Sequence, residues 1–317
     1  MHRIDGIVIM LPKAWCSSML MNSQDVMMRW FRRRKVGRLP AIDTAPFDPR
    51  ETVPEDVRLH AIGDVHGCAF LLDRHHASID AMQRAEPKAR VVEILLGDMI
   101  DRGPDSKAVI SRLIERSRHR FVIALRGNHE AMLMRFLNEP ETLKEWIRYG
   151  GLETLRSYGV KPGLPLEPGN MVRTAQEAME AIPSEHISFL RNLPLAWTCG
   201  GFTFVHAGLR PDVPLAEQAE RDLMEIREPF LSHSGSFGTF VIHGHTPVKS
   251  IDVRPNRINV DTGAFATGNL SSIVIERTRI MAISTTEPLQ ATGAAAAPTA
   301  ACGAAGALDG QFTVQAS

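Results

Sequence analysis

The sequence contains few cysteines and no excess of charge of either sign. Its four cysteines lie far apart, at Cys16, Cys68, Cys199 and Cys302, and none has the paired spacing of a zinc site. This pattern predicts reduced, unpaired thiols, which are typical of a cytoplasmic protein. Lysines plus arginines and aspartates plus glutamates each number 36, so no net field draws the protein to nucleic acid or to anionic lipid. Selectivity must therefore come from a local site.

Long apolar runs are also missing. No run approaches the roughly 20 residues of a membrane-spanning helix, and the apolar patch 7–11 is shorter than a signal-peptide core and is followed at once by Pro12 and Lys13. We therefore expect no transmembrane segment and no secretion signal. Apolar residues make up 44% of the chain, which is enough to bury the core of one large domain or of two. The sequence gives no indication of the oligomeric state.

The N-terminal residues 1–54 differ in composition from the middle of the chain. They contain six basic residues in 29–38 and four prolines in 40–54, which predicts a flexible segment and linker. The basic run could alternatively touch a membrane surface or RNA. Translation could also begin at Met27 or Met28, which would make the preceding residues an artefact of gene assignment.

Residues 55–286 alternate between strand and helix patterns. Hydrophobic periodicity predicts strand 57–62, helix 69–84, strand 91–96, helix 106–117, strand 121–125 and helix 130–137. Strands joined through helices in this way pair in parallel by right-handed crossovers. Their carboxyl ends then share one edge of the sheet, where ligands of open α/β sheets bind.

Residues 138–195 interrupt this alternation with Trp146, a Pro/Gly-rich stretch and a helix pattern at 174–181. We interpret them as a helical cap inserted between core elements, and we expect it to carry substrate specificity. Further strands are predicted at 202–205, 240–242, 258–260, 270–275 and 279–284. The Ala/Gly-rich residues 287–317 have few large apolar groups, which predicts a disordered tail.

Polar side chains follow several predicted strands at the point where each strand ends. They are Asp64, His66, Asp98, Asn128, His206 and His243. Any one of them could be only a turn residue beside glycine, but together they form a set of oxygen and nitrogen ligands without a thiolate. Such a set suits two divalent ions, such as Mn²⁺, Fe²⁺ or Zn²⁺, better than one closed zinc site.

Two ions about 3.5 to 4 Å apart are an arrangement that hydrolyses phosphate esters. We expect Asp98 to bridge them, with Asp64 and His66 on one ion and Asn128 and His206 on the other. Phosphoryl transfer also needs a cation for the phosphoryl oxygens and a proton for the leaving group. Arg102 fits the first need, with a surface salt bridge as its alternative role. His129 fits the second, with Asp101 orienting its imidazole.

Three segments resemble the signatures of the phosphoprotein phosphatase group of calcineurin-like metallophosphoesterases. They are Gly63-Asp64-Val65-His66-Gly67, Gly97-Asp98-Met99-Ile100-Asp101-Arg102-Gly103 and Arg126-Gly127-Asn128-His129-Glu130. The resemblance covers about residues 57 to 285 and implies an α/β fold, a β-sandwich flanked by helices with an inserted helical cap. It also implies two bound metal ions, Mn²⁺ first and iron or zinc otherwise, and direct attack on phosphorus by a metal-bridging hydroxide.

Matched position by position, the resemblance assigns the six strand-end residues as metal ligands. It assigns His129 as the general acid, Asp101 as its partner and Arg102 as a phosphate-binding arginine. The stretch 222–227 is similar to the one that supplies a second phosphate arginine, which would be Arg227. Arg126 could face the phosphate or be structural.

The resemblance implies a bacterial-type serine/threonine protein phosphatase that hydrolyses phosphoserine and phosphothreonine monoesters. The alternative on the same scaffold is a symmetrical dinucleoside tetraphosphatase, so the substrate is a phosphorylated protein or a nucleotide. Those enzymes usually lack the acid of the Asp-Arg-Gly triplet and read Gly-Asn-His-Asp, so Asp101 and Glu130 favour the protein phosphatase. The segment 149–159 resembles a bacterial subgroup whose members carry both names. A non-catalytic phosphate-binding protein would have lost a ligand or the acid, and none is missing.

Overall fold

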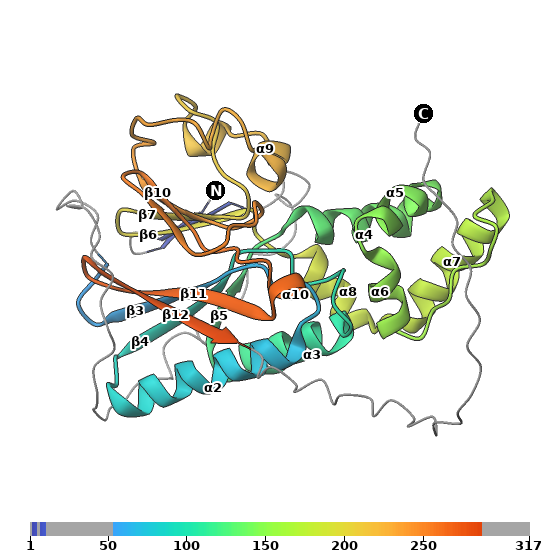
Figure 1. The fold of residues 1–317 in the computed structure, drawn as a ribbon, viewed down its shortest axis with the longest axis horizontal. Coiled ribbons are helices and arrows are strands. Elements are labelled where there is room, and N and C mark those ends of the chain that lie inside the picture. Colours follow the sequence, from blue (N-terminus) through green and yellow to red (C-terminus); the bar gives the residue numbers. More distant parts are fainter. Residues whose placement is uncertain (1, 5–6, 11–52, 287–317) are drawn as a thin grey trace, which may run out of the picture. The chain divides into compact units, whose positions relative to one another are not determined.

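A computed structural model of the chain describes residues 2–4, 7–10 and 53–286 (Figure 1). Two β-sheets form its centre. The five-stranded sheet contains, in spatial order, β12 (Arg279–Thr286), β11 (Asn269–Glu276), β3 (Val57–Ile62), β4 (Arg90–Leu95) and β5 (Phe121–Ala124). The seven-stranded sheet contains β1 (His2–Ile4), β2 (Ile7–Met10), β6 (Ala196–Cys199), β7 (Phe202–Val205), β8 (Phe240–His243), β10 (Arg257–Asn259) and β9 (Asp252–Arg254).

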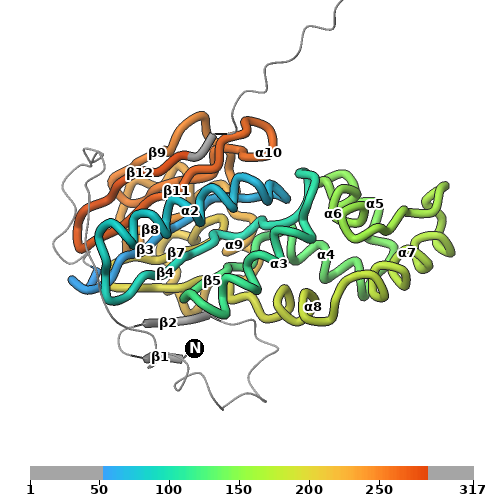
Figure 2. Tube along the Cα trace, turned by 90° about the horizontal axis from the view of Figure 1, so that it is seen from below, coloured from blue at the N-terminus to red at the C-terminus, as the bar shows by residue number. Residues whose placement is uncertain are grey.

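The two sheets share one apolar core. Leu59 and Ile94 of the first sheet belong to the same buried cluster as Phe204 and Ile242 of the second. The other face of the five-stranded sheet is covered by α2 (Ala69–Ala85) and α3 (Ser106–Ser117), which lie beneath the strands in Figure 1 and in front of them in Figure 2, the view from below. Because both of its faces are covered, every residue of β3 is buried. The predicted β-sandwich flanked by helices is confirmed.

The strands that carry the sequence motifs run parallel, as predicted. β3 pairs with β4 and β4 with β5, with Leu59 opposite Val92 and Glu93 opposite Val122. In the second sheet β8 pairs in parallel with both β7 and β10. Within each set the carboxyl ends therefore lie at one edge, and every motif of polar residues follows such an end.

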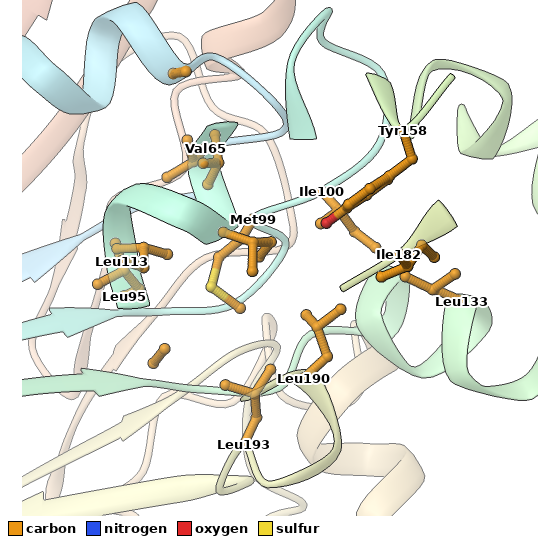
Figure 3. Close-up of a cluster of buried hydrophobic side chains, with 14 of the residues drawn as sticks. Val65, Leu95, Met99, Ile100, Leu113, Leu133, Tyr158, Ile182, Leu190 and Leu193 are labelled. Atoms are coloured by element: carbon orange, nitrogen blue, oxygen red, sulfur yellow. The ribbon is translucent and has the colours of Figure 1, made fainter. Parts of the chain in front are cut away.

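The inserted cap is helical. After α4 (Asn128–Asn138), its elements are η2 (Pro140–Thr142), α5 (Leu143–Arg148), α6 (Gly151–Ser157), α7 (Pro168–Ala181) and α8 (Ser184–Arg191). Figure 3 shows the buried cluster that joins them to the sheets: Met99 and Ile100 of the loop after β4 lie near Leu133 of α4 and Tyr158 and Leu190 of the cap. The cap thus packs directly on the loop that contains Asp98.

The remaining elements are short. η3 (Leu215–Glu217), α9 (Glu220–Glu225) and α10 (Ala264–Thr267) lie in the connections that follow β7 and β10. Within the segment expected to be flexible, β2 pairs antiparallel with β6, so these residues extend the sheet instead of forming a free tail. Residues 11–52, with the basic run, and the expected tail 287–317 lie outside the described residues. No helix in the described ranges is long and apolar enough to cross a bilayer.

Candidate metal centre

Asp98 lies at the centre of the site, and its two carboxylate oxygens face different histidines. Oδ2 lies 3.7 Å from His66 Nε2 and 3.7 Å from His129 Nε2. Oδ1 lies 3.3 Å from His206 Nε2. Two groups of potential ligand atoms share this carboxylate, His66 with His129 on one side and His206 with His245 on the other. A carboxylate between two clusters is what a bridge between two cations requires.

Main-chain carbonyls determine which ring nitrogen of each histidine is available. His66 Nδ1 lies 2.9 Å from the carbonyl oxygen of Ile100, and His206 Nδ1 lies 2.8 Å from that of Leu96. An Nδ1–H that donates to a carbonyl leaves the lone pair on Nε2, which is the state that binds a metal. In both residues this Nε2 faces Asp98.

Four atoms with lone pairs converge around His206. Its Nε2 lies 3.1 Å from Asn128 Oδ1 and 3.2 Å from His245 Nδ1, and those two atoms are 3.0 Å apart. Asp98 Oδ1 adds a negative charge to this group. Burial opposes the charged form of His206, but the nearby carboxylates, Asp98 first, together outweigh burial and raise the pKa of His206 to about 10. When the histidine rings present lone pairs, these nitrogen and oxygen atoms suit a divalent ion.

His243, predicted as the sixth ligand, lies outside both groups. Its buried ring packs edge to face on Phe230, with centroids 4.9 Å apart, and its Nδ1 lies 3.1 Å from the carbonyl oxygen of Gly244. His245 lies among the predicted ligands, and its backbone N–H donates to Asp64 Oδ2 over 3.1 Å. The strand-end pattern selects His243, the first histidine after the predicted strand 240–242, and does not select His245. On this geometry we propose His245 in place of His243.

Left-handed backbone marks the residues of the site. Among the described residues, seven non-glycine residues have positive φ, and five of these are His66, Asp98, Asp101, Arg102 and His245. Such a conformation costs on the order of 1 to 3 kcal/mol, so it persists only where the surroundings hold it, often at functional sites. His243 is not among them. The left-handed turn at His245 places its side chain 3.0 Å from Asn128 Oδ1.

Asp64 and Asp261 add two buried carboxylates to the site. Burial, and then the negative charge of Asp261, raise the pKa of Asp64 well above its usual range, and burial raises the pKa of Asp261 to about 6. Buried like charges are costly unless a cation compensates them. Space here is tight: a β-carbon at Gly244 would lie 2.1 Å from Asp64 Oδ1. Asp261 was not among the predicted ligands, although it too follows a strand end.

His129 and Asp101 form a buried pair beside the ligands. His129 Nδ1 lies 2.7 Å from Asp101 Oδ2. The same carboxylate accepts hydrogen bonds from Trp146 Nε1 at 2.7 Å and Thr154 Oγ1 at 2.6 Å, both in the cap. Burial opposes charge on His129, but the Asp98 and Asp101 carboxylates outweigh burial and raise the pKa of the imidazole. An imidazolium held in this way can act as a general acid through Nε2.

Glu130 fixes the backbone that carries Asp98. Its Oε2 accepts hydrogen bonds from the main-chain N–H groups of Gly127 and Asp98, and its Oε1 from those of Met99 and Ile100, at 2.8 to 3.2 Å. Sequence reasoning used Glu130 only to choose between substrates. Its buried position and four main-chain partners instead give it a role in holding two motifs together.

Three arginines surround the centre in different ways. The guanidinium carbon of Arg102 lies 4.8 Å from the ring centroid of Phe265. Burial lowers the pKa of His66 to about 3, and the charge of Arg102 adds to that effect. Burial lowers the pKa of His245 to about 3, and the charge of the exposed Arg227 adds to it. Arg126 Nη2 donates to the carbonyl oxygen of Arg191 over 2.6 Å, which favours its structural role.

Comparison with known proteins gives a consistent result. Residues 57–267 match the family model of the calcineurin-like phosphoesterases, which is more than half of the chain. The asymmetrical bis(5'-nucleosyl)-tetraphosphatase PrpE of Anoxybacillus flavithermus is 24% identical over 248 residues, which cover 72% of this chain and 94% of that protein. The enzyme of the same name from Bacillus cereus strain AH187 is 26% identical over 250 residues, with the same coverage of both chains.

A solved structure described as a candidate diadenosine tetraphosphatase has the same fold, with a TM-score of 0.50. Its sequence is 20% identical, and the match covers 72% of this chain and 93% of the other. The residues of the site, from Asp64 to His245 and Asp261, all lie within the matched family region. On these grounds the chain belongs to the calcineurin-like phosphoesterase family.

Proposed function

We propose that this metallophosphoesterase uses two divalent ions to hydrolyse a phosphoanhydride bond of bis(5'-nucleosyl) tetraphosphates. The proposal of two ions rests on the position of Asp98, whose Oδ2 faces His66 and whose Oδ1 faces His206. Asp64 and His66 would hold one ion with Asp98. Asn128, His206 and His245 would hold the other.

The bound ions would activate water and draw charge from the phosphoryl oxygens. The chain's own residues then divide the remaining work. Arg102 and Arg227 provide positive charge for the phosphoryl oxygens. His129 gives a proton from Nε2 to the leaving oxygen, and Asp101 keeps the imidazole in the required tautomer through Nδ1.

The relatives support a dinucleoside polyphosphate as the substrate. The PrpE proteins are named for asymmetrical cleavage of bis(5'-nucleosyl) tetraphosphates, and they align with this chain over 94% of their length. This support reverses the order of the two substrates that the motifs favoured, and it points to asymmetrical instead of symmetrical cleavage. The expected products are a nucleoside triphosphate and a nucleoside monophosphate.

A phosphoserine or phosphothreonine monoester is the second candidate, and the His129–Asp101 pair favours it. A serine or threonine alkoxide is a poor leaving group and needs a proton as the ester bond breaks. When an anhydride is hydrolysed, the nucleotide departs as a stable phosphate anion. Protonation of the leaving oxygen therefore matters less than it does for an ester. A buried acid with a 2.7 Å contact to its carboxylate partner is more useful for the monoester.

Hydrolysis assays on the purified full-length chain with Mn²⁺ test this proposal. Diadenosine tetraphosphate, a phosphoserine peptide and p-nitrophenyl phosphate are compared by kcat/KM, and nucleotide products are separated by anion-exchange chromatography. We expect preference for the tetraphosphate, release of ATP and AMP, and no activity after chelation. Preference for the phosphopeptide would establish the second candidate, and two ADP molecules would mean symmetrical cleavage.

A further inference from the structure

Two aromatic rings remain exposed beside the buried metal centre. Phe265 of α10 is 40% exposed, and Tyr149 at the end of α5 is 47% exposed. Each ring contacts a histidine of the site edge to face: the Phe265 and His66 centroids are 5.3 Å apart, and those of Tyr149 and His129 are 6.2 Å apart. His66 and His129 themselves are only 2% and 1% exposed. The two rings therefore lie where the buried centre meets solvent.

The rings come from separate parts of the fold. Figure 1 shows α10 at the side of the sheets that faces the cap, while Tyr149 belongs to the cap itself. Arg102 connects them, because its guanidinium lies over Phe265 and its main-chain N–H donates to the carbonyl oxygen of Gly150, next to Tyr149, over 3.1 Å. Phe265 thus lies against the proposed phosphate-binding cation, and Tyr149 precedes the residue that is hydrogen-bonded to the main chain of that arginine.

We propose that Phe265 and Tyr149 form a stacking site for a purine base of the substrate, an inference that rests on the proposed function. Exposed aromatic faces bind nucleobases by stacking, whatever the base. Asymmetrical cleavage breaks the anhydride next to a nucleoside, so a base lies close to the reacting phosphorus. Symmetrical cleavage breaks the central anhydride, with both bases one phosphate further away. Rings in contact with His66 and His129 fit the nearer base.

A matched pair of probes isolates the contribution of the nucleoside, and the ring variants then test the base. α,β-Methylene-ADP and methylenediphosphonate present similar non-hydrolysable phosphonates to the metals and arginines, and they differ by the adenosine. Equilibrium dialysis against the Mn²⁺-loaded full-length protein gives the dissociation constant of each. We expect the adenosine to tighten binding, and Phe265→Leu and Tyr149→Leu each to reduce that gain by about 5- to 150-fold. Phe265→Tyr and Tyr149→Phe, which keep the rings, should retain most of it.

Phe121→Leu is the matched control. Phe121 is 39% exposed at the start of β5, the opposite end of that strand from the site. Its replacement should therefore leave the dissociation constants of both probes unchanged. Equal weakening of both probes by Phe265→Leu would mean that the ring only holds Arg102, and it would overturn the stacking site. The stacking site would also be overturned if the adenosine did not increase the affinity of the wild type for the probe.

The outcomes for stacking and for the proposed function are separable. If the wild type cleaves diadenosine tetraphosphate but adenosine adds nothing to binding, the stacking site is wrong and the proposed function stands. If adenosine tightens binding through Phe265 and Tyr149 but the tetraphosphate is not cleaved, the stacking site stands and the proposed function is wrong.

Discussion

Trp146 Nε1 donates a hydrogen bond to Asp101 Oδ2 over 2.7 Å. Trp146 belongs to α5 of the cap, whereas Asp101 belongs to the loop after β4 and holds His129. Thr154 of α6 donates to the other oxygen of the same carboxylate. The cap therefore does more than cover the site, because its side chains fix the partner of the proposed general acid, His129.

Trp146→Phe should lower kcat by about 10-fold for a substrate with a poor leaving group, with little change in KM. The substitution keeps a ring in the core but removes a hydrogen bond to a carboxylate, a bond worth on the order of 1.5 to 3 kcal/mol. The rate of p-nitrophenyl phosphate hydrolysis, compared with that of an alkyl phosphate, measures the effect. If Trp146 orients the acid, the loss should be larger for the alkyl ester.

Trp197→Phe is a matched control for this prediction. Trp197 is equally buried, but its Nε1 has no hydrogen-bond partner among the described residues. This variant should lose some stability and no selectivity between leaving groups. Equal losses of activity on both esters in Trp146→Phe would show that Trp146 supports only the packing of the cap.

His129→Asn should lower turnover of phosphomonoesters by about 10² to 10⁴-fold, because the proton donor is lost. The metal content should stay unchanged, since the proposed ligands remain in place. Atomic absorption on the purified variant measures the content. Loss of an ion together with activity would instead make His129 a ligand, which its 3.7 Å distance from Asp98 Oδ2 allows.

Three buried histidines of β3 and α2, away from the metal centre, predict how stability depends on pH. Burial lowers the pKa values of His60, His75 and His76 to about 3, whereas an unfolded histidine titrates near 6.5. The stability that depends on their neutral form is complete above about pH 6.5 and is lost as pH falls toward 3. Each histidine contributes a slope of about 1.4 kcal/mol per pH unit in this window.

His60→Leu tests this prediction, because neither ring nitrogen of His60 has a hydrogen-bond partner within the described ranges. Urea unfolding of metal-free protein between pH 7 and pH 4, followed by circular dichroism, should show a shallower loss of stability in the variant. His119→Asn serves as the control, since the His119 side chain is 65% exposed. If the stability of His60→Leu depended on pH as that of the wild type does, His60 would not contribute to the loss of stability at low pH.

Much of the fold was readable from the sequence because local pattern and tertiary environment agree. Apolar runs such as 57–62 became buried strands, and the helix over 106–117 has the predicted bounds. The short helices α5 and α6 were not predicted. Gly150 and Gly151 lie at their junction, where glycine signals a turn, and these helices are stabilised by packing on the loop after β4 instead of by their own periodicity.

The candidate site was likewise predictable from the sequence only in part. Asp64, Asp98 and Asn128 could be placed because each follows a parallel strand. His245 could not be distinguished from His243 by that rule. β8 continues through His243, whose ring contacts Phe230, and only the left-handed turn at His245, with φ of 65°, returns a side chain toward Asn128. Such a turn follows from tertiary contacts, which a single sequence does not display.

A pair of variants decides between the two histidines. His245→Asn should remove one of the two ions, because His245 Nδ1 lies within 3.2 Å of both Asn128 Oδ1 and His206 Nε2. His243→Asn should keep both ions and lose some stability, since its ring packs against Phe230. The measurement is metal per folded chain, by plasma mass spectrometry after gel filtration and with the folded fraction taken from circular dichroism. Normalising to folded chain separates ligand loss from misfolding. The opposite pattern, with metal lost only in His243→Asn, would show that His243, at the end of the strand, is the ligand.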